Sequence, residues 1–347
     1  MFASQMPSSA KISLSLVSEI APSNHTLICP LDWGLGHAAR SLALARRLRA
    51  EGQQLSWASS GPAAEMLRRE LPGETIHELP PYRVEYRSRS MAWNIARQAY
   101  YWQKTIRAER RATARLVEAL GVDRIVSDSR FGCYHPGVHS VFLSHQLHPI
   151  THFAPASRAY RWQLNHFDEF WVPDDPGHKR LSGKLSDSAG YDSVLYIGPL
   201  PHIMPSAGQE GYDLLALLSG PEPMRTRLEE IIVPQLRDMK YSSKIVRGLP
   251  TTAESLVLDG IETFNFTDTA TLSPLLTAAR YVIARPGYST LMDLRALKKR
   301  AILVPTPGQT EQMYLAQRAQ LQGWAVAVMD QDKLDVRRAL ERLMQTG

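Results

Sequence analysis

The sequence has few cysteines and no long apolar run, and both shortages narrow the class of protein. It contains only Cys29 and Cys133 in 347 residues. Two cysteines are too few for a disulfide framework, so a reducing, cytoplasmic setting is expected. No apolar stretch approaches the roughly 20 residues that a membrane-spanning helix needs.

Strong charge imbalance and internal repetition are also missing. The formal net charge is +6, which suggests an anionic ligand or surface without requiring nucleic acid. No repeat or low-complexity tract interrupts the chain. Its 347 residues suffice for two domains of ordinary size, each with its own core.

Residues 1–24 are predicted to form a poorly ordered N-terminal extension. Their weakly apolar patch, 12–17, is interrupted by serines and preceded by the single basic residue Lys11. A secretory signal peptide would have a more basic start and a longer apolar core. A cleaved signal is the alternative interpretation.

From His25 onward, short apolar segments alternate with helical ones. This alternation predicts an α/β protein with mostly parallel sheets covered on both faces. The Pro- and Gly-rich stretch 198–206 is the best linker. We therefore expect two doubly wound Rossmann-like domains facing a central cleft, an N-terminal domain over 25–198 and a C-terminal domain over 199–347. The expected elements include strands at 26–31, 54–58, 124–127, 140–143 and 281–284, and helices at 37–50 and 92–120.

One βαβ unit, residues 281–316, carries the clearest candidate ligand site. A buried strand is followed by Arg285-Pro286-Gly287, a helix start, a second strand and a Pro- and Gly-rich loop. Backbone N–H groups at the helix start favour a phosphate, and Arg285 is expected to add positive charge at the rim. Side chains of the second loop can hold sugar hydroxyls. An ordinary βαβ layer with a surface loop is the alternative.

A Gly-rich turn follows the first strand and contains His37. Gly34-x-Gly36-x-x-Ala39 fits the dinucleotide fingerprint, but the second strand ends without the carboxylate that would bind a ribose. We favour His37 as a general base, because the helix N-terminus lowers its pKa and keeps the imidazole neutral. Packing or capping is the alternative role. Arg40 follows on the first helical turn.

Polar side chains follow two further strands of the N-terminal domain. Asp128 ends one strand and could orient His37, bind acceptor hydroxyls or cap the loop. His145 and Gln146 follow the next strand and are predicted to line the acceptor cleft rather than bind a metal. The pair Asp330 and Asp332 is predicted to cap a turn.

The segment 82–115 is basic and interleaved with aromatic side chains. It could form a solvated helix face, dock on anionic lipid, or bind nucleic acid. Nothing else in the chain supports nucleic-acid readout. We therefore expect no nucleic-acid partner, while peripheral contact at the inner face of the membrane, which a lipid-linked substrate would require, is kept open.

The GLGHAAR turn at 34–40, RPGYST at 285–290 and PTPGQTEQ at 305–312 together resemble GT-B glycosyltransferases. The resemblance is closest to bacterial transferases related to the peptidoglycan N-acetylglucosaminyltransferase of family 28 and to the UDP-glucuronosyltransferases. It covers roughly residues 26–325. It departs from the peptidoglycan enzyme at Asp32-Trp33 and in the TPGQTEQ segment, which lacks that enzyme's histidine.

The resemblance implies an inverting, metal-independent sugar transfer from a nucleotide sugar, most often a UDP-sugar, with no cofactor. His37 would match the catalytic base, with Asp128 beside it, and Asp293 the acid that holds the ribose. The donor-binding residues implied or expected are Ser219, Gly220, Arg247, Arg285, Gly287, Tyr288, Ser289, Thr290, Asp293, Gln309, Glu311 and Gln312. The expected acceptor-binding residues are Gly34, Gly36, Arg40, His145 and Gln146.

Three other functions remain open at the level of sequence. A nucleotide-sugar epimerase of the same fold would release its sugar still attached to nucleotide. A non-catalytic nucleotide-sugar-binding subunit would keep its function after loss of His37. A nicotinamide oxidoreductase would show cofactor absorbance.

Overall fold

The computed structural model describes residues 23–32, 34–82, 91–150, 154–206, 210–249 and 255–345. The expected extension 1–24 therefore lies almost entirely outside the described residues, as do Trp33 and part of the basic segment 82–115. The chain divides into two compact units. Unit 1 runs to Arg180 and resumes from Lys184 to Leu200, and unit 2 comprises Leu181–Gly183 and Pro201–Gly347.

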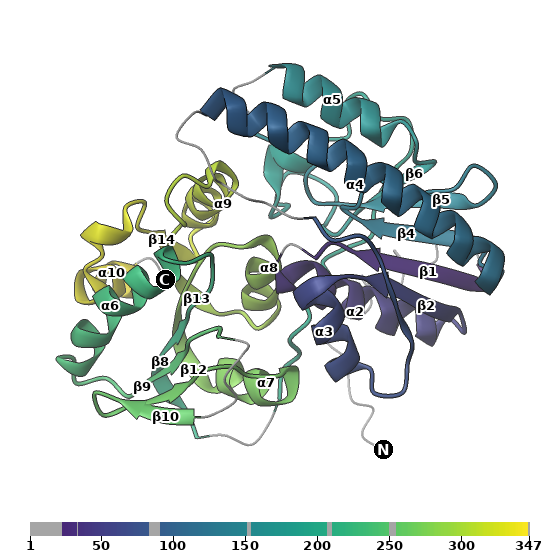
Figure 1. Ribbon diagram of the computed structural model, residues 1–347. Coiled ribbons are helices and arrows are strands. Elements are labelled where there is room, and N and C mark those ends of the chain that lie inside the picture. The colour runs from purple at the N-terminus through teal and green to yellow at the C-terminus, as the bar shows by residue number, and fades with distance from the viewer. Residues whose placement is uncertain are drawn as a thin grey trace. The chain divides into compact units, whose positions relative to one another are not determined.

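Unit 1 contains a parallel sheet in the strand order β3-β2-β1-β4-β5-β6-β7. Figure 1 shows the long helix α4 above this sheet and α2 and α3 below it. The central strands carry apolar residues on both faces, as a sheet covered on both sides requires, and every residue of β4 is buried. The strands are β1 (His25–Pro30), β2 (Gln54–Ser59), β3 (Ile76–Glu78), β4 (Arg124–Asp128), β5 (His139–Leu143), β6 (Glu169–Val172) and β7 (Val194–Tyr196). The helices are α2 (Leu35–Ala50), α3 (Gly61–Glu70), α4 (Met91–Leu120), α5 (Ala154–Leu164) and the 3-10 turn η1 (Gly183–Ser186), which begins on a residue of unit 2.

Unit 2 repeats the architecture with the strand order β10-β11-β9-β8-β12-β13-β14, in which only the β10–β11 pairing is antiparallel among the described strands. Its core packs α6 and α10 against β8, β12 and β13. The strands are β8 (Tyr212–Leu217), β9 (Ser243–Val246), β10 (Ser255–Leu258), β11 (Ile261–Phe264), β12 (Ala279–Ala284), β13 (Arg300–Leu303) and β14 (Ala325–Ala327). The helices are α6 (Met224–Arg237), α7 (Thr269–Ala278), α8 (Tyr288–Ala296), α9 (Thr310–Leu321), the 3-10 turn η2 (Gln331–Lys333) and α10 (Val336–Gln345).

Each sheet has a point where the strand order reverses, and ligands of doubly wound proteins bind at the carboxyl edge beside such a point. In unit 1 the reversal lies between β1 and β4, where Pro30 pairs with Asp128 in the last rung of the ladder. In unit 2 it lies between β8 and β12, where Ala284 pairs with Leu217. The loops that leave β1, β4, β8 and β12 are therefore the places to look for function.

The predicted fold class, two Rossmann-like α/β units with mostly parallel sheets, is confirmed. Three of these helices and strands were not predicted. Helix α5 and strand β14 were missed, and β10 was missed as the first arm of an antiparallel hairpin with β11. The hairpin turns on Asp259 and Gly260, both at positive φ, which is the geometry that a two-residue hairpin turn requires.

Candidate active site

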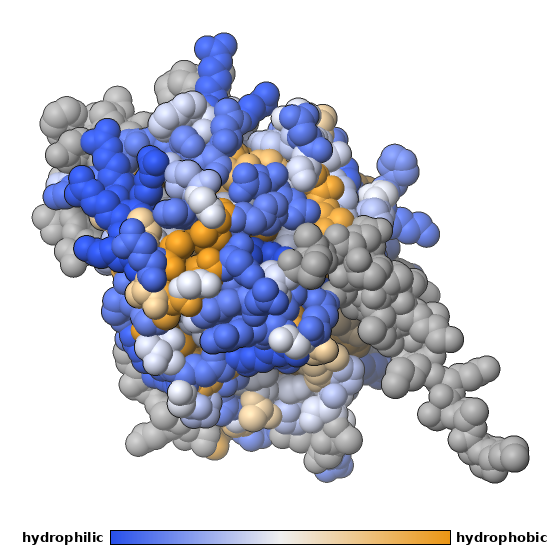
Figure 2. Space-filling model, turned by 90° about the vertical axis from the view of Figure 1, so that its right-hand side faces the viewer, coloured by the Kyte–Doolittle hydropathy of each residue, from blue (hydrophilic) through white to orange (hydrophobic). Residues whose placement is uncertain are grey.

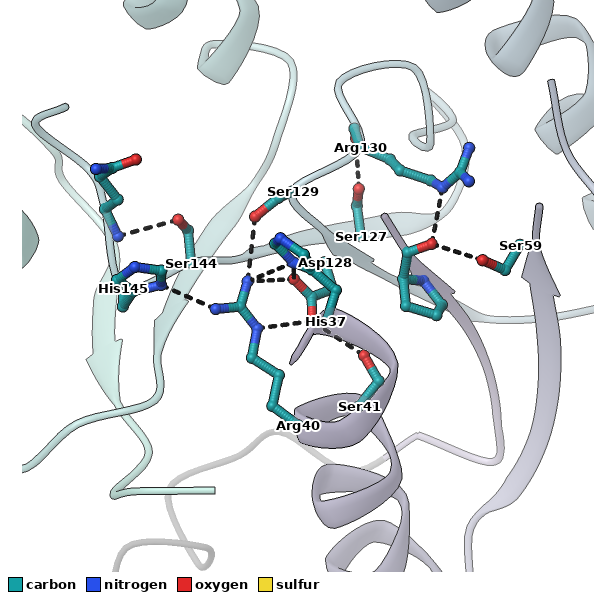
Figure 3. A network of polar contacts seen from close by, with 12 residues as sticks. His37, Arg40, Ser41, Ser59, Ser127, Asp128, Ser129, Arg130, Ser144 and His145 are labelled. Carbon is teal, nitrogen blue, oxygen red and sulfur yellow. Dashed lines mark hydrogen bonds and ion pairs between the residues drawn. The ribbon is translucent and has the colours of Figure 1, made fainter. Parts of the chain in front are cut away.

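The carboxyl edge of unit 1 brings His37 and Asp128 together (Figure 3). His37 lies on the first turn of α2, and Asp128 ends β4. The Nδ1 atom of His37 lies 2.7 Å from Oδ1 of Asp128. Because a carboxylate can only accept, Nδ1–H donates this bond, and the Nε2 atom is the nitrogen left with a lone pair. The two residues predicted as catalytic thus form a hydrogen-bonded pair.

Arg40 binds the same carboxylate from the next turn of α2. Its Nε donates to Oδ2 of Asp128 at 2.8 Å, and Nη2 donates to Oδ1. Ser41 Oγ adds a bond to Oδ2 at 3.0 Å. Burial by itself would raise the pKa of Asp128, but Arg40 and His37 outweigh it and hold the pKa well below its usual range. Asp128 is therefore a permanent anion beside His37.

His37 is held in the neutral form. Burial lowers its pKa below the usual value, Asp128 opposes this, and Arg40 adds to the lowering. One fifth of the side chain, 20%, remains exposed. A neutral imidazole with Nδ1–H fixed and its other nitrogen available is suited to accept a proton.

The other residues predicted to bind the acceptor lie around this pair in different ways. Arg40 is only 2% exposed, and it donates hydrogen bonds to Asp128. Its Nη1 also donates to Nδ1 of His145 at 2.8 Å. His145 is buried beside it, whereas Gln146 is half-buried and accepts from the Tyr160 hydroxyl through its backbone oxygen. Gly34 is exposed with φ +78, and nothing described lies within 4 Å of the position a Cβ would take.

Two serines of this network were not singled out by the sequence. Ser41 donates to Asp128, and Ser129 accepts from Arg40 Nη2 at 3.2 Å. Ser129 has φ 64, a left-handed backbone that is uncommon for a residue with a side chain and that recurs at functional loops. The only signal in the sequence was that both serines lie next to or near predicted site residues.

The corresponding edge of unit 2 carries the residues predicted to bind the donor. Helix α8 begins at Tyr288. Its N-cap residue, Gly287, has no side chain that could cap the helix, and its first turn contains no acidic residue. The positive end of the helix dipole therefore meets no carboxylate cap of its own. Ser289 and Thr290 are half-buried on the first turn, whereas Tyr288 is 4% exposed and packs in the core.

Arg285 does not lie on the rim as expected. It is 1% exposed, and its guanidinium donates to the backbone oxygens of Val304, Pro305 and Met224 and to Oε1 of Gln331, at 2.7–3.0 Å. It therefore ties the loops after β12 and β13 to the start of α6. Burial lowers its pKa to about 10, so it remains charged at neutral pH.

Arg247 lies on the loop after β9 and is already paired. Its Nε and Nη2 bind both oxygens of Glu229 at 2.9 and 2.7 Å, and Nη1 donates to Asn265 at 2.8 Å. Ser219 and Gly220, on the loop after β8, are exposed. Arg247 keeps its predicted place at this edge of the sheet, but its charge is balanced within the protein.

Asp293 and Gln312 both make hydrogen bonds to the backbone. Oδ1 of Asp293 accepts from the N–H groups of His202 and Ile203 at 2.6 and 3.0 Å. Oε1 of Gln312 accepts from the N–H of Thr306 at 2.8 Å. Glu311 is half-buried, and Gln309 is exposed at the N-cap of α9. A ribose contact by Asp293 therefore remains a prediction.

Two remaining sequence interpretations concern the cap at Asp330 and contact with a membrane. Asp330 caps η2 by accepting from the N–H of Asp332, which confirms the predicted turn role. Within the described part of the chain, no helix is both long and apolar enough to cross a membrane. The face shown in Figure 2 is mostly hydrophilic, with small apolar areas between polar side chains.

Residues 243–346 match the glycosyltransferase family 28 C-terminal domain. Most of unit 2 is thus covered by the match, including the loops after β9, β12 and β13. No curated protein sequence gives a significant match.

Three solved structures illustrate the likeness in fold, and two of them are glycosyltransferases by name. The glycosyltransferase SnogD from Streptomyces nogalater has a TM-score of 0.64 at 14% identity, covering 94% of this chain and 93% of its own. The calicheamicin glycosyltransferase CalG4 has a TM-score of 0.63 at 15% identity, with coverages of 93% and 90%. MurG from Acinetobacter baumannii has a TM-score of 0.55 at 14% identity, also with coverages of 93% and 90%.

The structural matches confirm the predicted GT-B fold, and at such low identity they establish the fold alone. The family match concerns residues 243–346 and agrees with the predicted enzyme class over that part of the chain. Residues 243–346 are therefore similar to the glycosyltransferase family 28 C-terminal domain, in a chain with the two-domain fold of the GT-B glycosyltransferases.

Proposed function

We propose that the protein transfers a sugar from a nucleoside-diphosphate sugar, a UDP-sugar first of all, to a hydroxyl acceptor. Unit 2 would bind the donor and unit 1 the acceptor. The reaction would invert the anomeric configuration, need no metal ion, and use His37 as the general base.

The pairing of His37 with Asp128 is the observation that carries this proposal. A buried anion 2.7 Å from Nδ1 fixes the tautomer and stabilises the imidazolium that forms when Nε2 takes a proton. Arg40 keeps Asp128 ionised, so Asp128 does not take the proton from His37. A histidine retained only for packing would not need a buried carboxylate that is itself held by three further donors.

The proposed reaction is a single displacement. The acceptor oxygen forms a bond to the anomeric carbon while the bond from that carbon to the diphosphate oxygen breaks. The acceptor proton moves to Nε2 of His37, and the bonding electrons leave with the nucleoside diphosphate. Charge developing on the diphosphate would be stabilised by the start of α8 and by Arg285, which are fixed dipoles and charges at one sheet edge.

A lipid-linked acceptor and peripheral membrane contact form a separate part of the proposal. On α4 the side chains of Arg107, Arg110, Arg111 and Arg115 are all exposed, and Trp162 on α5 is 57% exposed. Arginine with an exposed tryptophan is a combination that suits an anionic lipid interface. Co-sedimentation with vesicles containing anionic lipid, absent with neutral vesicles and reduced by 107/110 double Arg→Gln substitution, is the expected result. Equal partition to both vesicle types would contradict it.

The transfer proposal is tested by incubating the enzyme with UDP-, TDP- and GDP-sugars and a panel of hydroxyl acceptors. Release of nucleoside diphosphate that depends on acceptor, with a new glycoside of inverted configuration in mass and NMR spectra, is the expected outcome. A sugar product still attached to nucleotide would instead identify an epimerase. Ligand binding without turnover, unchanged in His37→Ala, would identify a binding subunit.

A further inference from the structure

Arg285 is a buried cation without an anion. Its partners are three backbone oxygens and the Gln331 amide, all of them neutral, and no described carboxylate forms an ion pair with it. Its exposure is only 1%. A buried charge is normally compensated by an opposite one, because dipoles alone only partly replace its lost hydration. The charge of Arg285 is thus still available to a ligand.

The other arginines at this edge show what a compensated cation looks like. Arg247 and Arg225 share the carboxylate of Glu229, with nitrogen–oxygen distances of 2.7 Å for both ion pairs. Arg285 lies at the point where the strand order reverses, between the loops after β8, β12 and β13. A cavity of about 440 Å³ opens beside it, lined among others by its partners Met224 and Gln331.

Two polar atoms at this point have no hydrogen-bond partner among the residues that the structure describes. They are Nε of Arg285 and Oγ1 of Thr306, and both atoms are buried. Thr306 itself is 2% exposed and follows β13. Leaving such a group unpaired is unfavourable, so two of them against the same glycine call for an explanation.

Both unpaired atoms face Gly220, on the exposed loop after β8. A Cβ built on Gly220 would lie 3.3 Å from Thr306 Oγ1 and 3.9 Å from Arg285 Nε, and apart from the neighbours of Gly220 in the chain no other described atom lies within 4 Å. A contact of 3.3 Å is already tight for a Cβ, so a side chain at position 220 would press on Thr306, and Gly220 also adopts φ +107. Gly220 therefore lets the loop after β8 lie directly over two hydrogen-bond donors, Arg285 Nε and Thr306 Oγ1, and we call this point the Gly220 niche.

We propose that Thr306, with Arg285 Nε, binds one diphosphate oxygen of the nucleotide-sugar donor at the Gly220 niche. This inference rests on the proposed function and adds Thr306 as a donor-binding residue. An anionic oxygen accepts from both atoms at once, whereas a neutral hydroxyl would leave the charge of Arg285 without a counterion. The positive charge stays in place as the sugar departs, so the same contact stabilises the leaving diphosphate.

The first test measures UDP and uridine affinity by calorimetric titration of wild type, Thr306→Val and Thr306→Ser. Valine keeps the shape and removes the hydroxyl, so UDP should bind about 10- to 100-fold more weakly. Serine keeps the hydroxyl and should stay within about threefold of wild type. Uridine lacks phosphates, so its affinity should be the same for all three proteins. In the absence of ligand, Thr306→Val should melt at the same or a higher temperature, because it loses an unpaired buried hydroxyl.

The second test fills the Gly220 niche with Gly220→Ala. The added methyl group would lie 3.3 Å from Thr306 Oγ1 and 3.9 Å from Arg285 Nε and would shield both atoms from a ligand oxygen, so UDP affinity should fall while uridine affinity holds. Gly323→Ala is the matched control, because Gly323 also has positive φ, +82, but nothing described lies within 4 Å of its Cβ position. It carries the same kind of backbone strain and should bind UDP like wild type.

The outcomes separate this inference from the function on which it rests. If wild type binds UDP and Thr306→Val binds it equally well, the Gly220 niche is not a phosphate site, although the donor site stands. Equal losses for UDP and uridine would also overturn the inference, because the hydroxyl would then act on the nucleoside. If wild type binds no nucleoside diphosphate, the proposed function fails and the inference fails with it.

Discussion

The carboxyl edges of the two sheets differ in whether their buried charges have oppositely charged partners. In unit 1, Arg40 and Asp128 neutralise each other, and His37 is added to a network whose charges are already balanced. In unit 2, Arg285 is just as deeply buried and has only neutral partners. Unit 1 thus contains the anion that would balance the imidazolium formed by the proposed proton transfer. In unit 2, the anion that would balance Arg285 would come from the proposed ligand.

This contrast also explains why the residues differ in how far substitution should affect stability. Removing one member of a buried ion pair leaves the other uncompensated, which costs roughly 3–5 kcal/mol. Removing a polar atom that has no partner costs little or can stabilise the fold. Substitutions in unit 1 should therefore affect both folding and catalysis, while Thr306 in unit 2 should affect only binding.

The largest effect is expected from His37→Ala. Loss of the proposed base should lower kcat by about 10²- to 10⁴-fold, while UDP affinity should not change if unit 2 binds the donor as proposed. His139→Ala is the control, since His139 is exposed and pairs with Glu169 at the opposite end of the sheet. Near-normal turnover by His37→Ala would break the assignment of unit 1 as the catalytic edge.

The second largest effect is expected from Asp128→Asn. The amide cannot balance Arg40 or orient His37 as an anion does, so kcat should fall and the free energy of unfolding should drop by roughly 3 kcal/mol. Asp238→Asn offers a control, because Asp238 and its partner Arg237 lie on the surface, where ion pairs contribute little to stability. Chemical denaturation of both variants gives the comparison. Equal losses in the free energy of unfolding would show that the buried pair in unit 1 contributes no more to stability than a surface pair.

A smaller effect is expected when the two arginines of unit 2 are compared. Arg285→Met removes the uncompensated cation and should weaken UDP binding about 10- to 100-fold. Arg247→Met leaves Glu229 paired with Arg225, so UDP affinity should change less. Titration of both folded variants decides the order. A greater loss in Arg247→Met would reverse the roles assigned to the two side chains.

The smallest expected effect is a shift in pH dependence. His37 can accept a proton only in its neutral form, and its pKa is lowered from 6.5, so kcat/KM should fall only below about pH 6.5. Asp128 raises the pKa of His37, so in Asp128→Asn the acid limb should move to lower pH. An acid limb above pH 7 in wild type would contradict the buried, neutral histidine.

The sequence was sufficient to predict the fold and to predict that His37 and Asp128 could meet at the carboxyl edge of the sheet in unit 1. Alternating apolar strands and amphipathic helices predicted two Rossmann-like units, and the carboxyl ends of β1 and β4 predicted that His37 and Asp128 could meet. Helix α5 and strands β10 and β14 were missed. In β10 an exposed edge position, Val257 at 72%, weakens the signal of burial that a strand pattern relies on.

The partners of Arg285 could not be predicted from the sequence. Nothing in Arg285-Pro286-Gly287 says whether the guanidinium turns to solvent or to the carbonyls of Val304, Pro305 and Met224, because those partners are 19 to 61 residues away. The same holds for Thr306, whose unpaired hydroxyl is visible only next to Gly220 in space. Long-range packing of three loops, rather than local propensity, creates that site.

The measurement that tests the account most directly is a calorimetric titration of wild-type protein with UDP, TDP, GDP, NADP and uridine. The account predicts micromolar binding of at least one nucleoside diphosphate and much weaker binding of uridine, because the phosphates supply the counterion that Arg285 lacks. Uridine binding as tightly as UDP, or no nucleoside diphosphate binding at all, would contradict it.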